Sequence, residues 1–253
     1  MMRYGLLILV LLLLPTQGLA QERRITDATG REVSVPERVE RVFAAGPPAS
    51  LFVFALAPEN LLGWTRTPRP DEAALLPKEY AALPTVGRLT GRGGSANLEA
   101  VMALAPDLIV DVGSTAPTYR DLAARVQSQS GIPTVLLNGR FDATAETFRV
   151  LGELLGRPER GEELAVWTEQ QIEAIRAGIA KVSPEQRPRV YYARGPAGLE
   201  TALSGSINIE VLDLLGVINV AGDGLGQGGL ASVSMEQLLA WDPEMVLTVD
   251  PHF

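Results

Sequence analysis

The chain has 253 residues, 46% of them apolar and 6% aromatic, with no cysteine, one histidine and a formal net charge of −8. The lack of cysteine excludes disulfides and Cys-based zinc sites, and the acidic charge argues against nucleic acid as a partner. The length and apolar content suit one large domain or two smaller ones.

The first twenty residues have the pattern of a secretory signal peptide. Arg3 supplies the positive start, residues 6–14 form an unbroken apolar run, and Gly18–Ala20 place small residues before Gln21. This run is too short for a comfortable membrane span. We therefore expect a soluble periplasmic protein cleaved before Gln21, and no lipid anchor because no cysteine follows.

Residues 21–157 predict a first α/β lobe. A hairpin is expected at 25–36, around a turn at 28–30. Beyond it, short apolar runs alternate with helical patterns, which indicates βαβ units and a parallel sheet. The expected strands are 38–46, 60–65, 83–87 and 133–138, and the expected helices are 49–57 and 118–131.

A long helix is predicted for 158–183. Apolar residues from Leu164 to Val182 recur at a spacing close to 3.6, and Pro158 is a typical opening residue. At 1.5 Å per residue the helix would span roughly 36 Å, the width of a lobe. We expect it to be a stiff connector.

Residues 184–253 predict a second α/β lobe, with a strand at 187–195, a helix at 207–216 and a strand at 217–222. The run 245–249 is apolar on both faces, which predicts a central strand. Since no helix follows to cover it, we expect the second lobe to be truncated at the C-terminus.

One pattern occurs in both lobes. "NLEAVMALAPDLIVDV" (97–112) returns as "SMEQLLAWDPEMVLTV" (234–249), each reading as a short helix, a proline and an apolar strand. Glu99 matches Glu236, and Pro106 matches Pro243. Two copies indicate two lobes built on one plan.

Several motifs are weaker signals. Residues 224–229 satisfy G-x-G-x-x-G, but no strand-to-helix turn surrounds them, so a glycine-rich loop fits better than a dinucleotide site. A Ser-His-acid enzyme is disfavoured by the single histidine, His252. That residue is either a ligand contact at a strand end or an exposed terminal residue.

Four segments carry a specific resemblance: 25–44, 97–113, 198–222 and 233–250. Together they are similar to the periplasmic binding proteins of ABC importers for iron–siderophore, haem and cobalamin. The resemblance implies two Rossmann-like lobes with mainly parallel sheets, bridged by one long helix, with ligand held between them. It also implies that Glu99 and Glu236 meet arginines on the two halves of a permease dimer. A glutamate in a first helical turn is favourable in any case.

Candidate ligand contacts follow the predicted strand ends. Arginine forks suit carboxylate, catecholate or phosphate oxygens, and aromatic rings can stack on a flat ligand. Each also has a plain structural interpretation, as a solvated loop arginine or a core-edge aromatic. The candidates are Pro47, Pro48, Ser50, Trp64, Thr65, Arg66, Arg88, Arg92, Gly113, Ser114, Tyr192, Arg194, Glu200 and His252.

The sequence thus predicts a monomeric periplasmic solute-binding protein, not an enzyme, without cofactor or resident metal. It would capture an iron–siderophore or related anionic metal chelate and deliver it to an ABC importer. Haem, cobalamin and molybdate stay open as ligands. An axial haem ligand would come from Tyr119, Tyr191, Tyr192 or His252. A secreted α/β hydrolase and a non-transporting sensor or scaffold are the rivals from other classes.

Overall fold

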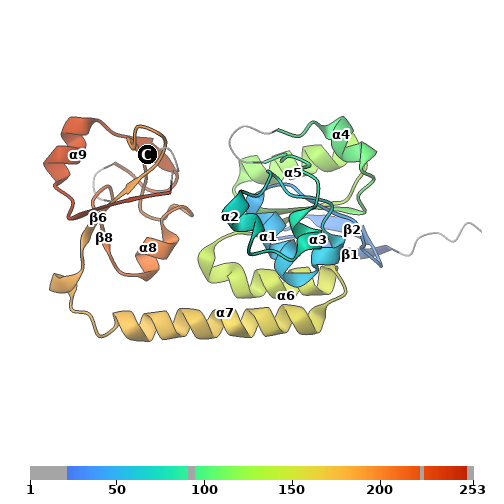
Figure 1. Cartoon of the computed structure of the whole chain (residues 1–253), viewed down its shortest axis with the longest axis horizontal. Coiled ribbons are helices and arrows are strands. Elements are labelled where there is room, and N and C mark those ends of the chain that lie inside the picture. The colour runs from blue at the N-terminus through green and yellow to red at the C-terminus, as the bar shows by residue number, and fades with distance from the viewer. Residues whose placement is uncertain (1–21, 91–94, 223–224, 250–253) are drawn as a thin grey trace, which may run out of the picture.

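The computed structural model describes residues 22–90, 95–222 and 225–249. Two lobes stand side by side and are joined at one end by helix α7 (Figure 1). The predicted signal peptide, Arg92 and His252 lie outside the described residues, as does Gly224 of the glycine-rich motif. Among the helices of the described part, none is both long and apolar enough to cross a membrane.

The first lobe is a three-layer α/β unit. Strands β3, β4 and β5 form a parallel sheet in that order, and β1 and β2 form a separate antiparallel hairpin. The strands are β1 (Glu22–Thr26), β2 (Glu32–Pro36), β3 (Val42–Ala44), β4 (Leu108–Gly113) and β5 (Thr134–Asn138). The α-helices are α1 (Pro47–Leu56), α2 (Pro70–Ala73), α3 (Lys78–Ala81), α4 (Leu98–Ala103), α5 (Pro117–Ser130) and α6 (Thr144–Leu154). Short 3-10 turns occupy Pro58–Asn60 and Phe141–Ala143.

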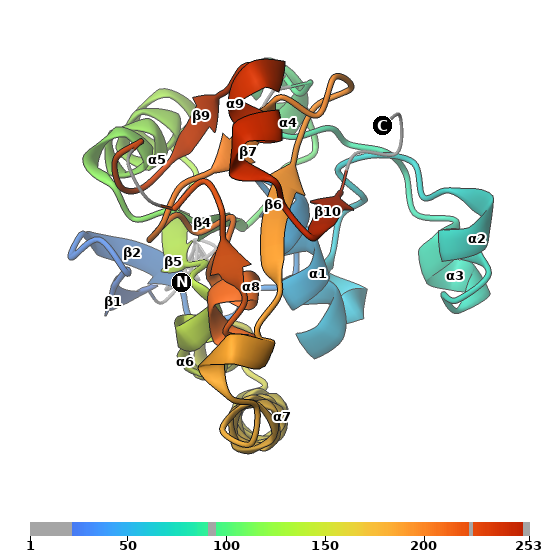
Figure 2. The ribbon, with the colours of Figure 1, turned by 90° about the vertical axis from the view of Figure 1, so that its left-hand side faces the viewer.

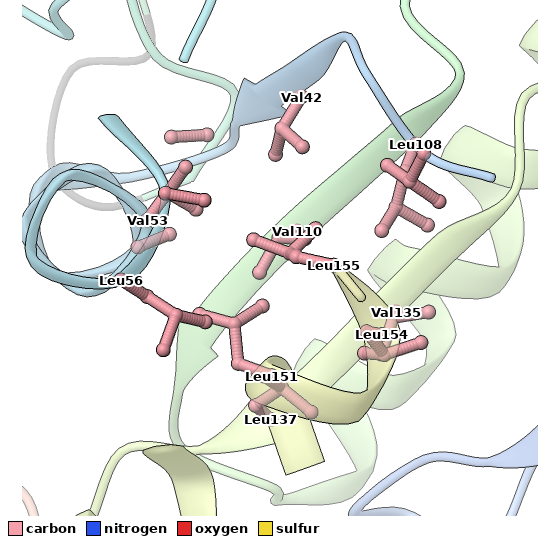
Figure 3. Close-up of a cluster of buried hydrophobic side chains, with 14 of the residues drawn as sticks. Val42, Val53, Leu56, Leu108, Val110, Val135, Leu137, Leu151, Leu154 and Leu155 are labelled. Atoms are coloured by element: carbon pink, nitrogen blue, oxygen red, sulfur yellow. The ribbon is translucent and has the colours of Figure 1, made fainter. Parts of the chain in front are cut away.

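Both faces of this sheet are buried, which is why its strands read as unbroken apolar runs. On one face, Val110 and Val135 pack with Val53 of α1 and Leu151 of α6 (Figure 3). On the other face, Phe43, Ile109 and side chains of α4 and α5 form a second cluster. The core therefore fixes the ends of the three strands as one rigid edge.

Helix α7 (Pro158–Ile179) begins at the proline that the sequence indicates and ends a few residues before the predicted end. It packs along α6, where Gly152 and Gly161 bring the two backbones together. A Cβ built on Gly161 would lie 2.7 Å from the Phe148 carbonyl oxygen. The half of the bridge that starts at Pro158 is thus part of the first lobe.

The second lobe has a parallel sheet in the order β10-β6-β8 and a small antiparallel hairpin of β7 and β9. Its strands are β6 (Arg189–Ala193), β7 (Glu200–Ala202), β8 (Ile218–Asn219), β9 (Leu230–Ser232) and β10 (Met245–Thr248). Its helices are α8 (Glu210–Leu214) and α9 (Met235–Trp241), after a 3-10 turn at Pro184–Gln186. The two-lobed, mainly parallel architecture is confirmed.

Three expectations differ from the structure. Residues 60–65 and 83–87 form only isolated bridges, Val42 with Leu61 and Trp64 with Thr85, instead of strands. Helix α8 is shorter than the predicted 207–216. Within the described residues β10 lies at an edge of its sheet, not at the centre, and Met245, Val246 and Leu247 are 51%, 47% and 37% exposed.

Candidate ligand-binding site

Five predicted contacts meet at one cavity of the first lobe. A hollow of about 320 Å³ is lined by Pro47, Ser50, Trp64, Thr65 and Arg66, together with Leu51, Pro68, Glu72, Leu75 and Leu76. Its lining comes from the start of α1, from residues 64–68 and from α2 with the residues just after it. Most of its lining is aliphatic or aromatic, so it suits a ligand with an apolar body.

Two of these side chains are held by the fold. Trp64 is only 6% exposed, donates from Nε1 to the Tyr80 carbonyl at 2.8 Å and packs on Phe54. Ser50 is buried and donates to the Pro47 carbonyl at 2.8 Å, within the first turn of α1. Both therefore shape the cavity wall, and little of either side chain is available to a ligand.

Arg66 supplies the charge at this cavity, but it is already paired. Its guanidinium donates to both oxygens of Glu72, at 2.7 and 2.6 Å. The Arg66 side chain, with the backbone N–H of Arg69, lowers the pKa of Glu72 to about 2. Glu72 is therefore charged at any physiological pH, and an anionic ligand must compete with it for Arg66.

A buried carboxyl that the sequence reading missed lies at the strand ends. Asp111 of β4 has Thr90 Oγ1 at 3.1 Å, and that hydroxyl is also 3.1 Å from the Ala45 carbonyl. Burial raises the pKa of Asp111. The sequence did carry a signal for this buried carboxyl, because Asp111 is the single charged residue inside the apolar run "LIVDV". Asp111 anchors the segment that carries Arg88, a half-buried predicted contact.

Ser114 lies where β4 and β5 end together. Its hydroxyl accepts from the Ala116 backbone at 3.3 Å, and the Gly139 N–H donates to the Gly113 carbonyl at 2.8 Å. A Cβ on Gly139 would lie 2.6 Å from the Gly113 Cα, so this approach requires glycine. Neither Ser114 nor Arg88 lines the 320 Å³ cavity, and the exposed Pro48 lies beside it in α1.

The predicted contacts of the second lobe form a separate cluster. Arg194 Nε lies 3.4 Å from Glu200, and Nη1 lies 3.4 Å from the Tyr192 hydroxyl and 3.3 Å from Asn208. The guanidinium carbon is 5.9 Å from the Tyr192 ring centre. These contacts are long for charge-assisted hydrogen bonds, so the Arg194 group is loosely held. Asn208 carries no sequence signal for this role.

The tyrosines differ in access to a ligand. Tyr191 is fully buried, and its hydroxyl donates to the Gly198 carbonyl at 2.8 Å. Tyr192 is also mostly buried, at 7% exposure, whereas Tyr119 on α5 is exposed. Tyr191 is therefore a core residue and not an axial haem ligand.

The matched glutamates occupy equivalent places. Glu99 is the second residue of α4, which Asn97 caps, and Glu236 is the second residue of α9, which Ser234 caps. Both side chains are exposed. A backbone hydrogen bond and one from Ser234 lower the pKa of Glu236. Helices α4 and α9 both lie at the side of the molecule opposite α7 (Figures 1 and 2).

The sequence profile of the "Periplasmic binding protein" family matches residues 65–252. The chain belongs to this family. It is a periplasmic binding protein of an ABC importer, in a family of solute-binding proteins rather than enzymes. The family identification that the sequence motifs support is therefore confirmed.

The individual relatives share about a quarter of their residues with this chain. Over 260 residues the chain is 26% identical to the molybdate-binding protein MolA of Haemophilus influenzae, with 91% of this chain and 70% of MolA covered. An ABC transporter solute-binding protein from Sulfurospirillum deleyianum has a TM-score of 0.78 at 27% identity, with 91% of this chain and 72% of that chain covered. The haem-binding protein RhuT from Roseiflexus sp. RS-1 has a TM-score of 0.65 at 24% identity, covering 83% of this chain and 76% of RhuT.

Proposed function

We propose that this protein captures an iron–siderophore or related anionic metal chelate between its lobes and delivers it to the importer as a monomer. The supporting observation is the pairing of a largely apolar 320 Å³ cavity in the first lobe with Arg66 at its rim. Arg194 adds a second guanidinium from the other lobe. An organic chelate offers an apolar body and anionic oxygens to such a surface.

Delivery would use Glu99 and Glu236. Each stands near the N-terminus of the helix in its own copy of the repeated element, and the two helices share one side of the molecule. A two-fold permease presents the same surface twice, so matched carboxylates on two lobes fit it. Such charges set orientation and association rate more than affinity.

Molybdate is the second candidate ligand, because MolA is similar to this chain over 91% of its length. The arginine pairs favour the larger chelate. A bare oxoanion needs several uncommitted donors, whereas Arg66 already binds Glu72 and Arg194 lies against Glu200.

Native mass spectrometry of protein purified from periplasm, with its bound ligand, tests the proposal. We expect a co-purified mass of an organic chelate, and tighter binding of a ferric tricatecholate than of molybdate in titrations. Binding of molybdate alone would overturn the chelate assignment and leave the transport class in place.

A further inference from the structure

One ion pair joins the lobes directly. Glu210, the first residue of α8 in the second lobe, lies 2.5 Å from the Arg140 guanidinium of the first lobe. Its other oxygen accepts the Phe141 backbone N–H at 2.6 Å. One carboxylate thus contacts two groups across the gap between lobes, and α8 stands on the side that faces the first lobe (Figure 1).

This contact is partly withdrawn from water. The Glu210 side chain is 10% exposed and that of Arg140 is 46% exposed. A cavity of about 200 Å³ beside them is lined by residues of both lobes and of the bridge, including Ile172 and Arg176 of α7. Asp142 and Asp213 stand nearby, and Arg140 counteracts the burial that raises the pKa of Asp213. The pair therefore lies where the first lobe, α7 and the second lobe meet.

The first-lobe end of the contact is tied to the strand ends. The Arg140 backbone N–H donates to Asn138 Oδ1 at 3.0 Å, and the next residue back, Gly139, is bonded to Gly113. Gly113 is the last residue of β4 and precedes the predicted contact Ser114. Arg140 is therefore connected to the start of the Ser114 loop through hydrogen bonds from backbone N–H groups at the strand ends.

The second-lobe end is tied to Arg194. Asn208, two residues before Glu210, accepts from Arg194 Nη1 at 3.3 Å. Its backbone N–H also donates to Ser206 Oγ at 3.3 Å, which fixes the turn that leads into α8. The Arg140–Glu210 contact thus connects the segment that leads to Ser114 in the first lobe with the segment that contacts Arg194 in the second lobe.

We infer that Arg140 and Glu210 form an interlobe strap that sets the distance between the ligand-contacting surfaces. They are positioning residues and touch no ligand themselves. The strap complements α7, which packs along α6 of the first lobe and is joined to the second lobe by residues 180–188. Two lobes joined by a bridge can close or open about it. An ion pair between the lobes favours the conformations in which it stays formed. The inference concerns the same site as the proposed function and rests on it for its biological meaning.

The strap can be tested without any ligand. The chain has no native cysteine, so Arg125→Cys on α5 and Ala240→Cys on α9, both exposed, place one spin label on each lobe. Pulsed electron–electron double resonance then measures the distance between the two labels, and so between the lobes. We expect a narrow distribution in the otherwise unmodified chain. With Glu210→Ala, we expect a shift or broadening larger than the original width.

Conservative variants separate the ion pair from the backbone contact. Glu210→Gln keeps an acceptor for the Phe141 N–H but loses the charge, so it should broaden the distribution less than alanine does. The double variant Arg140→Gln with Glu210→Gln should broaden the distance distribution no more than the more severe single variant. Both changes break the same ion pair, so their effects should not add. The matched control is Glu59→Gln, which breaks the 2.7 Å pair with Arg157 inside the first lobe and should leave the distribution unchanged.

The outcomes are distinct. An unchanged distribution in Glu210→Ala, with circular dichroism showing a folded chain, overturns the strap. So does equal broadening in Glu59→Gln. Neither result bears on which ligand binds, so failure of the strap and failure of the chelate proposal are separate findings. If the strap holds, ferric tricatecholate should dissociate faster from Glu210→Gln than from the unmodified chain.

Discussion

Ala105 and Asp242 adopt the same left-handed backbone conformation, with φ of 45° and 46°, one residue before the proline of each repeated element. They are the non-glycine residues with positive φ in the described part of the chain. The equivalence extends to their surroundings. Arg41, just before β3, donates to the Leu104 carbonyl, and Arg189, the first residue of β6, donates to the Trp241 carbonyl, each at 2.5 Å.

The shared conformation predicts unequal effects of glycine. An L-residue in the left-handed region is strained by about 1–2 kcal/mol, and aspartate tolerates it better than alanine. Ala105→Gly should therefore raise the free energy of unfolding by about 0.5–1 kcal/mol after the entropy of glycine in the unfolded chain is subtracted. Asp242→Gly should have a smaller effect. Urea unfolding measures both.

The control for this prediction is Ala100→Gly, inside α4. There the backbone is helical, so glycine should destabilise by about 0.5–1 kcal/mol. Loss of stability in Ala105→Gly, similar to that of Ala100→Gly, would contradict a strained Ala105.

Local patterns predicted most of the fold, for physical reasons. The proline before each repeated strand, the start of α7 at Pro158 and the buried parallel strands all depend on neighbours in sequence. The prediction of a strand at 60–65 was wrong, because this segment forms only isolated bridges. An apolar run does not show whether a partner strand lies beside it.

The candidate site was predictable only in part. Pro47, Ser50, Trp64 and Arg66 were chosen because they follow the ends of predicted strands, and they do meet at one cavity. The pairing of Arg66 with Glu72 depends on where α2 folds back. The contact of Arg140 with Glu210 depends on the angle between two lobes. No periodicity in the sequence encodes either relationship, so the sequence showed the arginines and not their partners.

Release of Arg66 from Glu72 should strengthen the binding of an anionic chelate. In Glu72→Gln the guanidinium loses its charged competitor, so the affinity for a ferric tricatecholate should rise. Arg66→Ala should lower it. Since the pKa of Glu72 is about 2, the pair is intact throughout the neutral range, and the gain should not vary between pH 5 and 8. Isothermal titration gives both constants, with Glu59→Gln as the control.

Arg194 should contribute from the other lobe. If ligand binding removes this guanidinium from water and engages it directly, Arg194→Ala should weaken tricatecholate binding by about 2 kcal/mol or more, mostly through faster dissociation. Stopped-flow mixing separates the two rates. Unchanged affinity in both Arg66→Ala and Arg194→Ala would contradict an anionic ligand between the lobes.

Docking charges should affect transport and not binding. Glu99→Lys with Glu236→Lys reverses both exposed carboxylates and should abolish stimulation of the importer's ATPase in liposomes. Affinity for the ligand should be unchanged, because neither residue lines the cavity. Glu173→Lys on the exposed face of α7 makes a charge change on the opposite side and should stimulate normally. Normal transport by the double variant would remove the docking role.

Asp27 should make the fold sensitive to acid. Burial raises its pKa, but hydrogen bonds from Thr29 and Arg31 outweigh this and lower the pKa below 3.8. The stabilisation is therefore complete above pH 3.8 and is lost as the pH falls through the lower native value. Asp27→Asn should reduce the free energy of unfolding by about 3 kcal/mol at pH 7, since it removes the only carboxylate paired with Arg31 among the described residues and leaves its guanidinium with the Thr134 carbonyl. It should also flatten the dependence of stability on pH in acid. Glu40→Gln, which breaks an exposed pair with Arg38, should change stability by less than about 0.5 kcal/mol.

At high protein concentration, the edge strand β10 should make the otherwise monomeric protein associate with itself. Met245 to Thr248 pair with β6 on one side only within the described residues, and the apolar side chains of the strand are exposed on both faces. An open edge of this kind is a template for another strand. Light scattering should therefore show association that grows with protein concentration, and Val246→Lys should suppress it by placing a charge on the strand. Leu75→Lys is the matched control, because Leu75 is 86% exposed but belongs to no strand. Equal suppression by both changes would mean that general surface hydrophobicity drives association. A chain that stays monomeric at all concentrations would mean that the β10 edge is protected in solution.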